Sequence, residues 1–172
     1  TPPKTQSALL EAMQEYQVTS MGKAHKLPRP FLVFATQNPI EQEGTYPLPE
    51  AQLDRVMFSL WMDYPSAEEE VEIVLATTED IEAQAQPVCS IDDINAFQHL
   101  VRRIPVSRHV VKYAVSLARA TRPQGEIATK YVADYVSWGA GPRASQHAIL
   151  AAKALAVIEG VPAVTAEHIR LV

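Results

Sequence analysis

The amino-acid sequence predicts an α/β unit over residues 1–64, followed by an all-helical unit over residues 65–172. The α/β unit is indicated by five successive apolar residues, Phe31–Ala35, which are typical of a parallel strand buried on both faces. The helical unit is indicated by serine and threonine residues that precede helical apolar patterns at several points after Tyr64-Pro65. The expected fold class is therefore an α/β core with parallel strands and a helical appendage.

In the first unit, helices should alternate with short strands. Two prolines suit the first turn of an amphipathic helix over Lys4–Glu15. A hairpin or loop containing Gly22 should follow over Val18–Lys26. The remaining expected elements are the strand Phe31–Ala35, a short helix over Glu50–Asp54 and a second strand over Val56–Met62.

In the second unit, local capping patterns predict where helices begin. Ser66 with Glu69, and Ser90 with Asp93, have the spacing of a capping box, in which two residues satisfy each other's backbone N–H groups. Further helices are expected after Ser107, over 143–159 and after Thr165, with a polar loop over 122–129 and a short apolar segment over 131–138.

Length and composition indicate a globular protein with a sizeable core. The 172 residues are 47% hydrophobic and 20% charged, with a formal net charge of −5. This acidic balance argues against nucleic-acid binding, which normally requires a basic stripe. A single cysteine, Cys89, excludes an internal disulfide and fits a reducing, cytoplasmic compartment. No apolar run is long enough for a membrane span.

Three polar side chains follow the predicted buried strand. Thr36, Gln37 and Asn38 end it, and Pro39 stops further pairing. Ligands of open α/β sheets bind beyond the carboxyl ends of the strands, so Asn38 could orient a water or a phosphate oxygen. Alternatively, its amide satisfies local backbone groups in a turn.

Arg55 directly follows Asp54 at the end of a short predicted helix. It could form a surface pair with Asp54 or Glu50, which would contribute little. Alternatively, its planar fork of donors could reach a phosphate held by a neighbouring subunit.

Arg143 lies in the first turn of a predicted helix, where a cation is unfavourable unless an anion is near. Together with the amide groups after Gly141-Pro142, its guanidinium would suit a phosphate. The alternative is a surface arginine near Glu159 or Asp134.

Other catalytic or binding motifs find no support in the sequence. The five histidines form no H-x-x-x-H pattern, so no metal site is expected. No G-x-S-x-G nucleophile motif and no G-x-x-x-x-G-K-[ST] phosphate loop occur in the 172 residues.

Three segments, Pro2–Glu15, Ala35–Arg55 and Gly141–Ser145, resemble the MoxR family of AAA+ ATPases. The resemblance implies a nucleotide-binding α/β core with a helical lid. It implies that Asn38 is the sensor 1 residue that positions the attacking water, and that Arg55 is the arginine finger. Arg143 matches the sensor 2 arginine of the lid.

The resemblance also implies a function. Family members use ATP and Mg²⁺ and act as rings, here expected to be hexamers, in chaperone-like remodelling or maturation of client proteins, often with a von Willebrand factor A domain protein. The family's Walker A and Walker B motifs precede its first helix, so we expect the chain alone to bind no cofactor and to be inactive. The alternative is a non-catalytic interaction module on the same fold; a nucleic-acid remodeller is disfavoured by the acidic charge.

Overall fold

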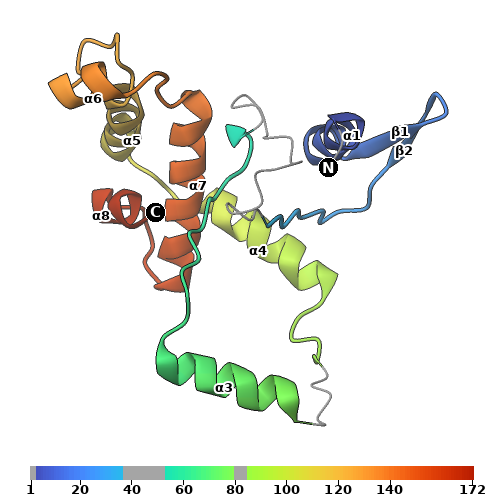
Figure 1. Cartoon of the computed structure of the whole chain (residues 1–172). Helices are drawn as coiled ribbons and strands as arrows, with labels where there is room; N and C mark the ends of the chain where they lie inside the picture. The colour runs from blue at the N-terminus through green and yellow to red at the C-terminus, as the bar shows by residue number, and fades with distance from the viewer. Residues whose placement is uncertain (1–2, 37–52, 80–84) are drawn as a thin grey trace.

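The computed structural model describes residues 3–36, 53–79 and 85–172. The helix and hairpin of residues 3–26 lie at one end of the molecule, and the helices of residues 108–171 lie at the other (Figure 1). In order, the elements are α1 (Pro3–Glu15), β1 (Gln17–Ser20), β2 (Lys23–Lys26), α3 (Ala67–Thr78), α4 (Ile91–Arg103), α5 (Arg108–Ala120), α6 (Lys130–Tyr135), α7 (Pro142–Ile158) and α8 (Ala166–Leu171).

The predicted hairpin forms directly after α1. Strands β1 and β2 pair antiparallel, with Gln17 opposite Lys26 and Ser20 opposite Lys23. The two turn residues have positive φ angles, 51° at Met21 and 75° at Gly22, as a tight two-residue hairpin turn requires. The hairpin is tied to α1 through Glu11, whose carboxylate accepts hydrogen bonds from the side chain and backbone of Thr19.

The two predicted parallel strands are not formed. Residues 31–36 and 56–66 are neither helix nor strand, and Phe34 is 92% exposed. The prediction that Phe31–Ala35 and Val56–Met62 are buried strands is therefore wrong for this structure. A strand that is apolar on both faces needs hydrogen-bonding neighbours and cover on both sides, and the described residues place neither there. In the part of the chain that the structure describes, the sheet consists of β1 and β2 alone.

The capping patterns predicted the helix starts well. Ser66 with Glu69 and Ser90 with Asp93 form reciprocal capping boxes, and the Ser107 side chain accepts from the backbone N–H of Val110. The predicted apolar segment after residue 130 begins as the short helix α6.

The core of the helical part lies between α5, α7 and α8. It is built largely from small side chains, which allow the helix backbones to approach closely. A parallel bridge between Val106 and Val164 joins the segments that precede α5 and α8. The core residues are Val110, Ala114, Ala152, Ala156, Val164 and Ile169.

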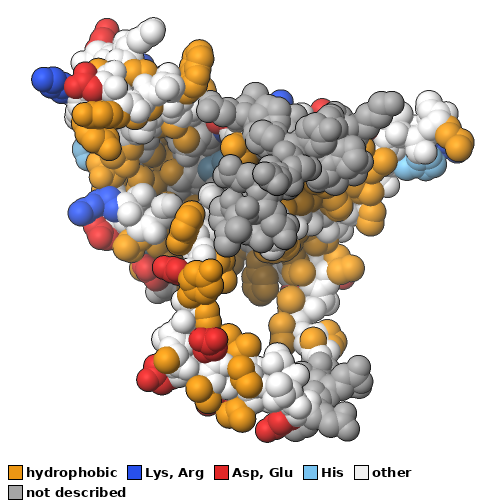
Figure 2. Space-filling view, viewed as in Figure 1, with side chains coloured by type: hydrophobic (Ala, Val, Ile, Leu, Met, Phe, Trp, Pro, Cys, Tyr) orange, Lys and Arg blue, Asp and Glu red, His pale blue; other side chains and the backbone are white. Residues whose placement is uncertain are grey.

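Helix α3 stands apart from this core (Figure 1). None of its residues is buried, and its visible face carries both acidic and hydrophobic side chains (Figure 2). The preceding segment is also exposed, with Trp61 at 84%. Among the described helices, none combines the length and apolar character needed to cross a membrane.

Candidate functional site at the amino end of α7

The amino end of α7 meets the segment that follows residue 53. Arg143, in the first turn of α7, donates a hydrogen bond through Nη1 to Oδ2 of Asp54 at 3.0 Å. The two side chains are 47% and 35% exposed, so the pair is partly open to solvent. A cation in the first turn of a helix needs a nearby anion, and Asp54 supplies one.

The start of α7 leaves room for this carboxylate. Gly141 is the N-cap and makes no side-chain cap, and Pro142 occupies the first helical turn without needing a hydrogen-bond partner. A Cβ atom on Gly141 would lie 3.2 Å from Oδ1 of Asp54. The Asp54 carboxylate therefore packs directly against the N-terminal residues of α7, where helix amide groups favour negative charge.

A second set of contacts fixes the turn that leads into α7. Thr121 Oγ1 accepts a hydrogen bond from the backbone N–H of Ala140 at 2.8 Å, and Arg122 Nε donates to the Ala140 carbonyl at 3.0 Å. Gly139 packs so closely that a Cβ atom there would lie 2.5 Å from Cα of Arg122. The end of α5 thus sets where α7 begins and where Arg143 points.

The segment after Asp54 runs along α7. Between them lies an open cavity of about 250 Å³, whose wall combines apolar side chains with one side-chain carboxylate and one imidazole. It is lined by Asp54, Val56, Met57, Phe58, Ala144, His147, Ala148, Ala151 and Val172.

Two of the three predicted site residues lie in the described part of the chain. Arg55 is half-buried and directly follows Asp54, the residue that pairs with Arg143. Asn38 lies outside the described residues. Arg143 pairs with neither of the partners considered from sequence, Glu159 or Asp134.

Asp54 is the residue of this site that sequence reasoning missed. Its place in the sequence predicts a pair with its neighbour Arg55, whereas the structure pairs it with Arg143, 89 positions away. No local pattern carries that information, because it depends on how the helical part folds back.

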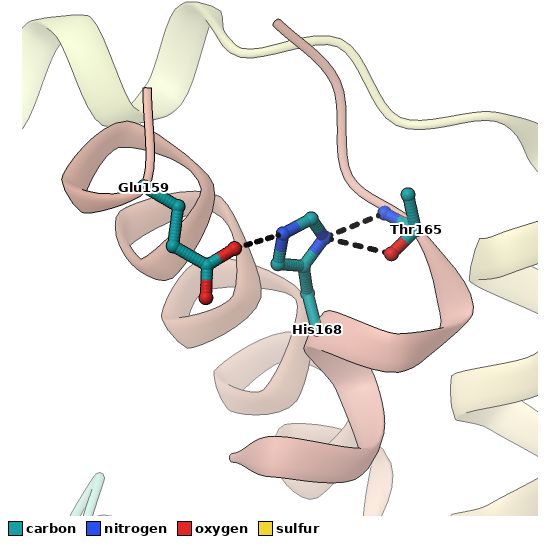
Figure 3. A network of polar contacts seen from close by, with 3 residues as sticks. All are labelled: Glu159, Thr165 and His168. Carbon is teal, nitrogen blue, oxygen red and sulfur yellow. Dashed lines mark hydrogen bonds and ion pairs between the residues drawn. The ribbon is translucent and has the colours of Figure 1, made fainter. Parts of the chain in front are cut away.

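The opposite end of α7 carries a closed polar network (Figure 3). His168, only 4% exposed, accepts a hydrogen bond at Nδ1 from the Thr165 N–H at 2.9 Å. Its Nε2 lies 3.0 Å from Oε2 of Glu159, the C-cap residue of α7. Because the amide N–H can only donate, the ring proton is on Nε2 and points to Glu159. This network joins α7 to α8 and has the character of a structural contact.

Among the described residues, no three histidine, cysteine, aspartate or glutamate side chains are grouped so as to hold a metal ion. The groups suited to a ligand are the Arg143 guanidinium and the first N–H groups of α7. Both favour an anion, and a phosphate presents oxygens that match the fork of the guanidinium as a carboxylate does.

Comparison with known proteins places this geometry in a class. Residues 1–58 match the family model described as ATPase family associated with various cellular activities (AAA), and residues 128–172 match the AAA lid domain model. Arg143 and the whole of α7 therefore lie in a lid domain of AAA ATPases.

The relatives identify the branch of that class. The chain is 45% identical over 161 residues to Chaperone MoxR1 of Mycobacterium tuberculosis, covering 92% of this chain and 42% of the relative. It is 28% identical over 182 residues to Protein MoxR of Paracoccus denitrificans, covering 99% and 53%. The chain belongs to the MoxR family of AAA ATPases.

A solved structure supports the fold over the same span. A crystal structure of a protein from Cytophaga hutchinsonii superposes with a TM-score of 0.89 at 40% identity, covering 99% of this chain and 52% of that one. The chain therefore spans about half the length of the relatives it matches.

Proposed function

We propose that this chain supplies the sensor and lid residues of a MoxR-like ATPase, which couples ATP binding and hydrolysis in a ring to chaperone-like remodelling or maturation of partner proteins. The observation that carries the proposal is the position of Arg143. It is a partly exposed guanidinium in the first turn of a lid helix, held by a carboxylate that a phosphate can replace.

The proposal gives each predicted residue one role. Asn38 orients the attacking water as sensor 1, Arg143 contacts the phosphates from the lid, and Arg55 reaches the nucleotide of the adjacent subunit. Residues 1–64 form part of the ATPase core and residues 65–172 form the lid. The phosphate-binding loop and the Mg²⁺-holding carboxylates come from outside the 172 residues, which hold no G-x-x-x-x-G-K-[ST] motif. Bound Mg²⁺ neutralises charge on the phosphates during transfer.

The proposed function also predicts the partners of the protein. We expect self-assembly into a ring, a hexamer in the simplest case, together with a client protein and a von Willebrand factor A domain protein in the cytoplasm. The formal net charge of −5 gives no support to a nucleic-acid partner.

The action of Arg55 in a neighbouring active site tests the proposal. Full-length Arg55→Ala protein is mixed with a full-length variant defective in the phosphate-binding loop, and the ATPase activity of the mixture is compared with that of each variant alone at the same total protein. Because a finger acting in trans can be supplied by the second variant to the intact phosphate site of the first, two variants that are each inactive should together recover activity, up to about a quarter of the wild-type rate for random mixing. The exposed arginine Arg103 of α4 offers a matched control, and Arg103→Ala should leave activity unchanged.

A mixture that is as inactive as its two components would contradict the action of Arg55 in trans. A wild-type protein that assembles but hydrolyses no ATP would overturn the enzyme and favour the non-catalytic interaction module.

A further inference from the structure

We infer that Asp54 is a positioning residue that competes with the nucleotide phosphate for Arg143 and so links Arg143 to Arg55. This inference rests on the proposed function. It starts from the contact itself, in which Nη1 of Arg143 and Oδ2 of Asp54 are 3.0 Å apart across 89 positions of sequence.

Stability alone does not account for this pair. An ion pair whose members are 47% and 35% exposed is screened by solvent and contributes little to folding. Its position is more telling, because Arg143 lies in the first turn of α7, where the helix dipole disfavours a cation. The negative charge of the Asp54 carboxylate balances the positive charge of the guanidinium. It also balances the partial positive charge of the first N–H groups of α7, which no side chain of the N-cap residue Gly141 can cap.

A phosphate satisfies the same groups. Carboxylates and phosphates both accept paired hydrogen bonds from a guanidinium and both are favoured at a helix N-terminus. The two anions cannot fill one position at once, and like charges repel. Arg143 therefore exchanges one anion for the other when nucleotide binds, and Asp54 is released from α7.

The released residue is next to Arg55. The backbone N–H of Val56 donates to the carbonyl of Leu53 at 3.0 Å, which places Asp54 and Arg55 together inside one tight turn. A change in the partner of Asp54 acts on that turn directly. Since Arg55 is proposed to serve the neighbouring nucleotide, the exchange connects the occupancy of one site to the finger of the next.

The test uses the full-length protein and the non-hydrolysable nucleotide Mg·AMP-PNP, with affinity measured by calorimetry. Asp54→Asn removes the competing charge with little change of shape and should tighten binding about two- to fivefold, the range for a partly exposed ion pair. In an Arg143→Ala background the same substitution should have no effect, because the competition is gone. Asp92→Asn, an exposed carboxylate in the first turn of α4, is the matched control and should leave affinity unchanged.

The steady-state readout separates this role from a structural one. Asp54→Asn should lower KM and also lower the Hill coefficient of ATP hydrolysis toward 1, whereas loss of folded protein lowers only the apparent kcat. If Asp54→Asn fails to fold, Asp54→Ser should show the same tightening.

Unchanged or weaker binding by the folded Asp54 variants, with normal wild-type binding, would overturn the inference and leave the proposed function intact. Equal tightening in the Arg143→Ala background would also overturn it. A wild-type protein that binds no Mg·AMP-PNP would overturn the proposed function, and the inference with it.

Discussion

Replacing Gly139 with alanine perturbs the turn that aims Arg143. The added Cβ atom would lie 2.5 Å from Cα of Arg122 and 2.6 Å from the Thr121 carbonyl oxygen, distances that backbone atoms cannot accept. The turn must move away, and the hydrogen bonds that join Ala140 to Thr121 and Arg122 are lost. At about 1 kcal/mol for each bond plus residual strain, the expected loss is about 2–3 kcal/mol in the free energy of unfolding.

Chemical denaturation measures that loss, and another glycine provides the control. Gly160 has φ of 68° and nothing within 4 Å of an added Cβ, so alanine there meets backbone strain alone, about 1 kcal/mol. Thr121→Val should cost about 1 kcal/mol and be non-additive with Gly139→Ala, since both break the same hydrogen bond. A loss at Gly139 no greater than at Gly160, or strict additivity with Thr121→Val, would refute the reasoning.

Three further predictions concern other parts of the chain. His168→Ala should destabilise the protein by about 2–3 kcal/mol because it removes a buried ring and leaves the Thr165 N–H without its acceptor, whereas the exposed His99→Ala should change thermal stability little. Hydrogen bonds from the side chain and backbone of Ser90 lower the pKa of Asp93, so its stabilising effect is present above the unfolded value near pH 4 and lost as pH falls through the folded pKa. Asp93→Asn should therefore make the free energy of unfolding less dependent on pH between about 5 and 3. If the variant shows the same dependence on pH as the wild type, the capping box does not contribute to it. The 172 residues alone should show no ATP affinity by calorimetry near neutral pH, and micromolar binding would contradict the assignment of the phosphate loop elsewhere.

The features that sequence predicted are those set by near neighbours along the chain. A capping box needs only Ser90 and Asp93, three positions apart, and the hairpin needs only a turn at Gly22. Thr165 was predicted as an N-cap, and the structure adds that His168 takes the position usually held by glutamate or glutamine in the capping box. No local sequence pattern predicts a histidine at this position, because the stabilisation that its ring provides depends on the contact with Glu159 at the end of α7.

The features that sequence missed depend on distant partners. Hydrophobicity predicted that Phe31–Ala35 would be buried, but a strand forms only where neighbouring strands accept its hydrogen bonds. The pairing of Asp54 with Arg143 likewise arises only when residues 54–58 lie along α7. Charge pattern alone favoured Arg55 as the nearer partner of Asp54.

The two ends of α7 are built for different purposes. At its carboxyl end, His168 is buried and fixed by two neighbours, and the small core residues beside it lock α7 against α5 and α8. At its amino end, the Arg143 pair is partly open to solvent and can change partners. The 17 residues of α7 form a helix about 25 Å long. Because its hydrogen-bonded backbone is stiff, a displacement of the amino end is passed along the helix to the carboxyl end, where α7 is packed against its neighbours. If Arg143 exchanges Asp54 for a phosphate as we propose, the helices packed on α7 should move with it as one body.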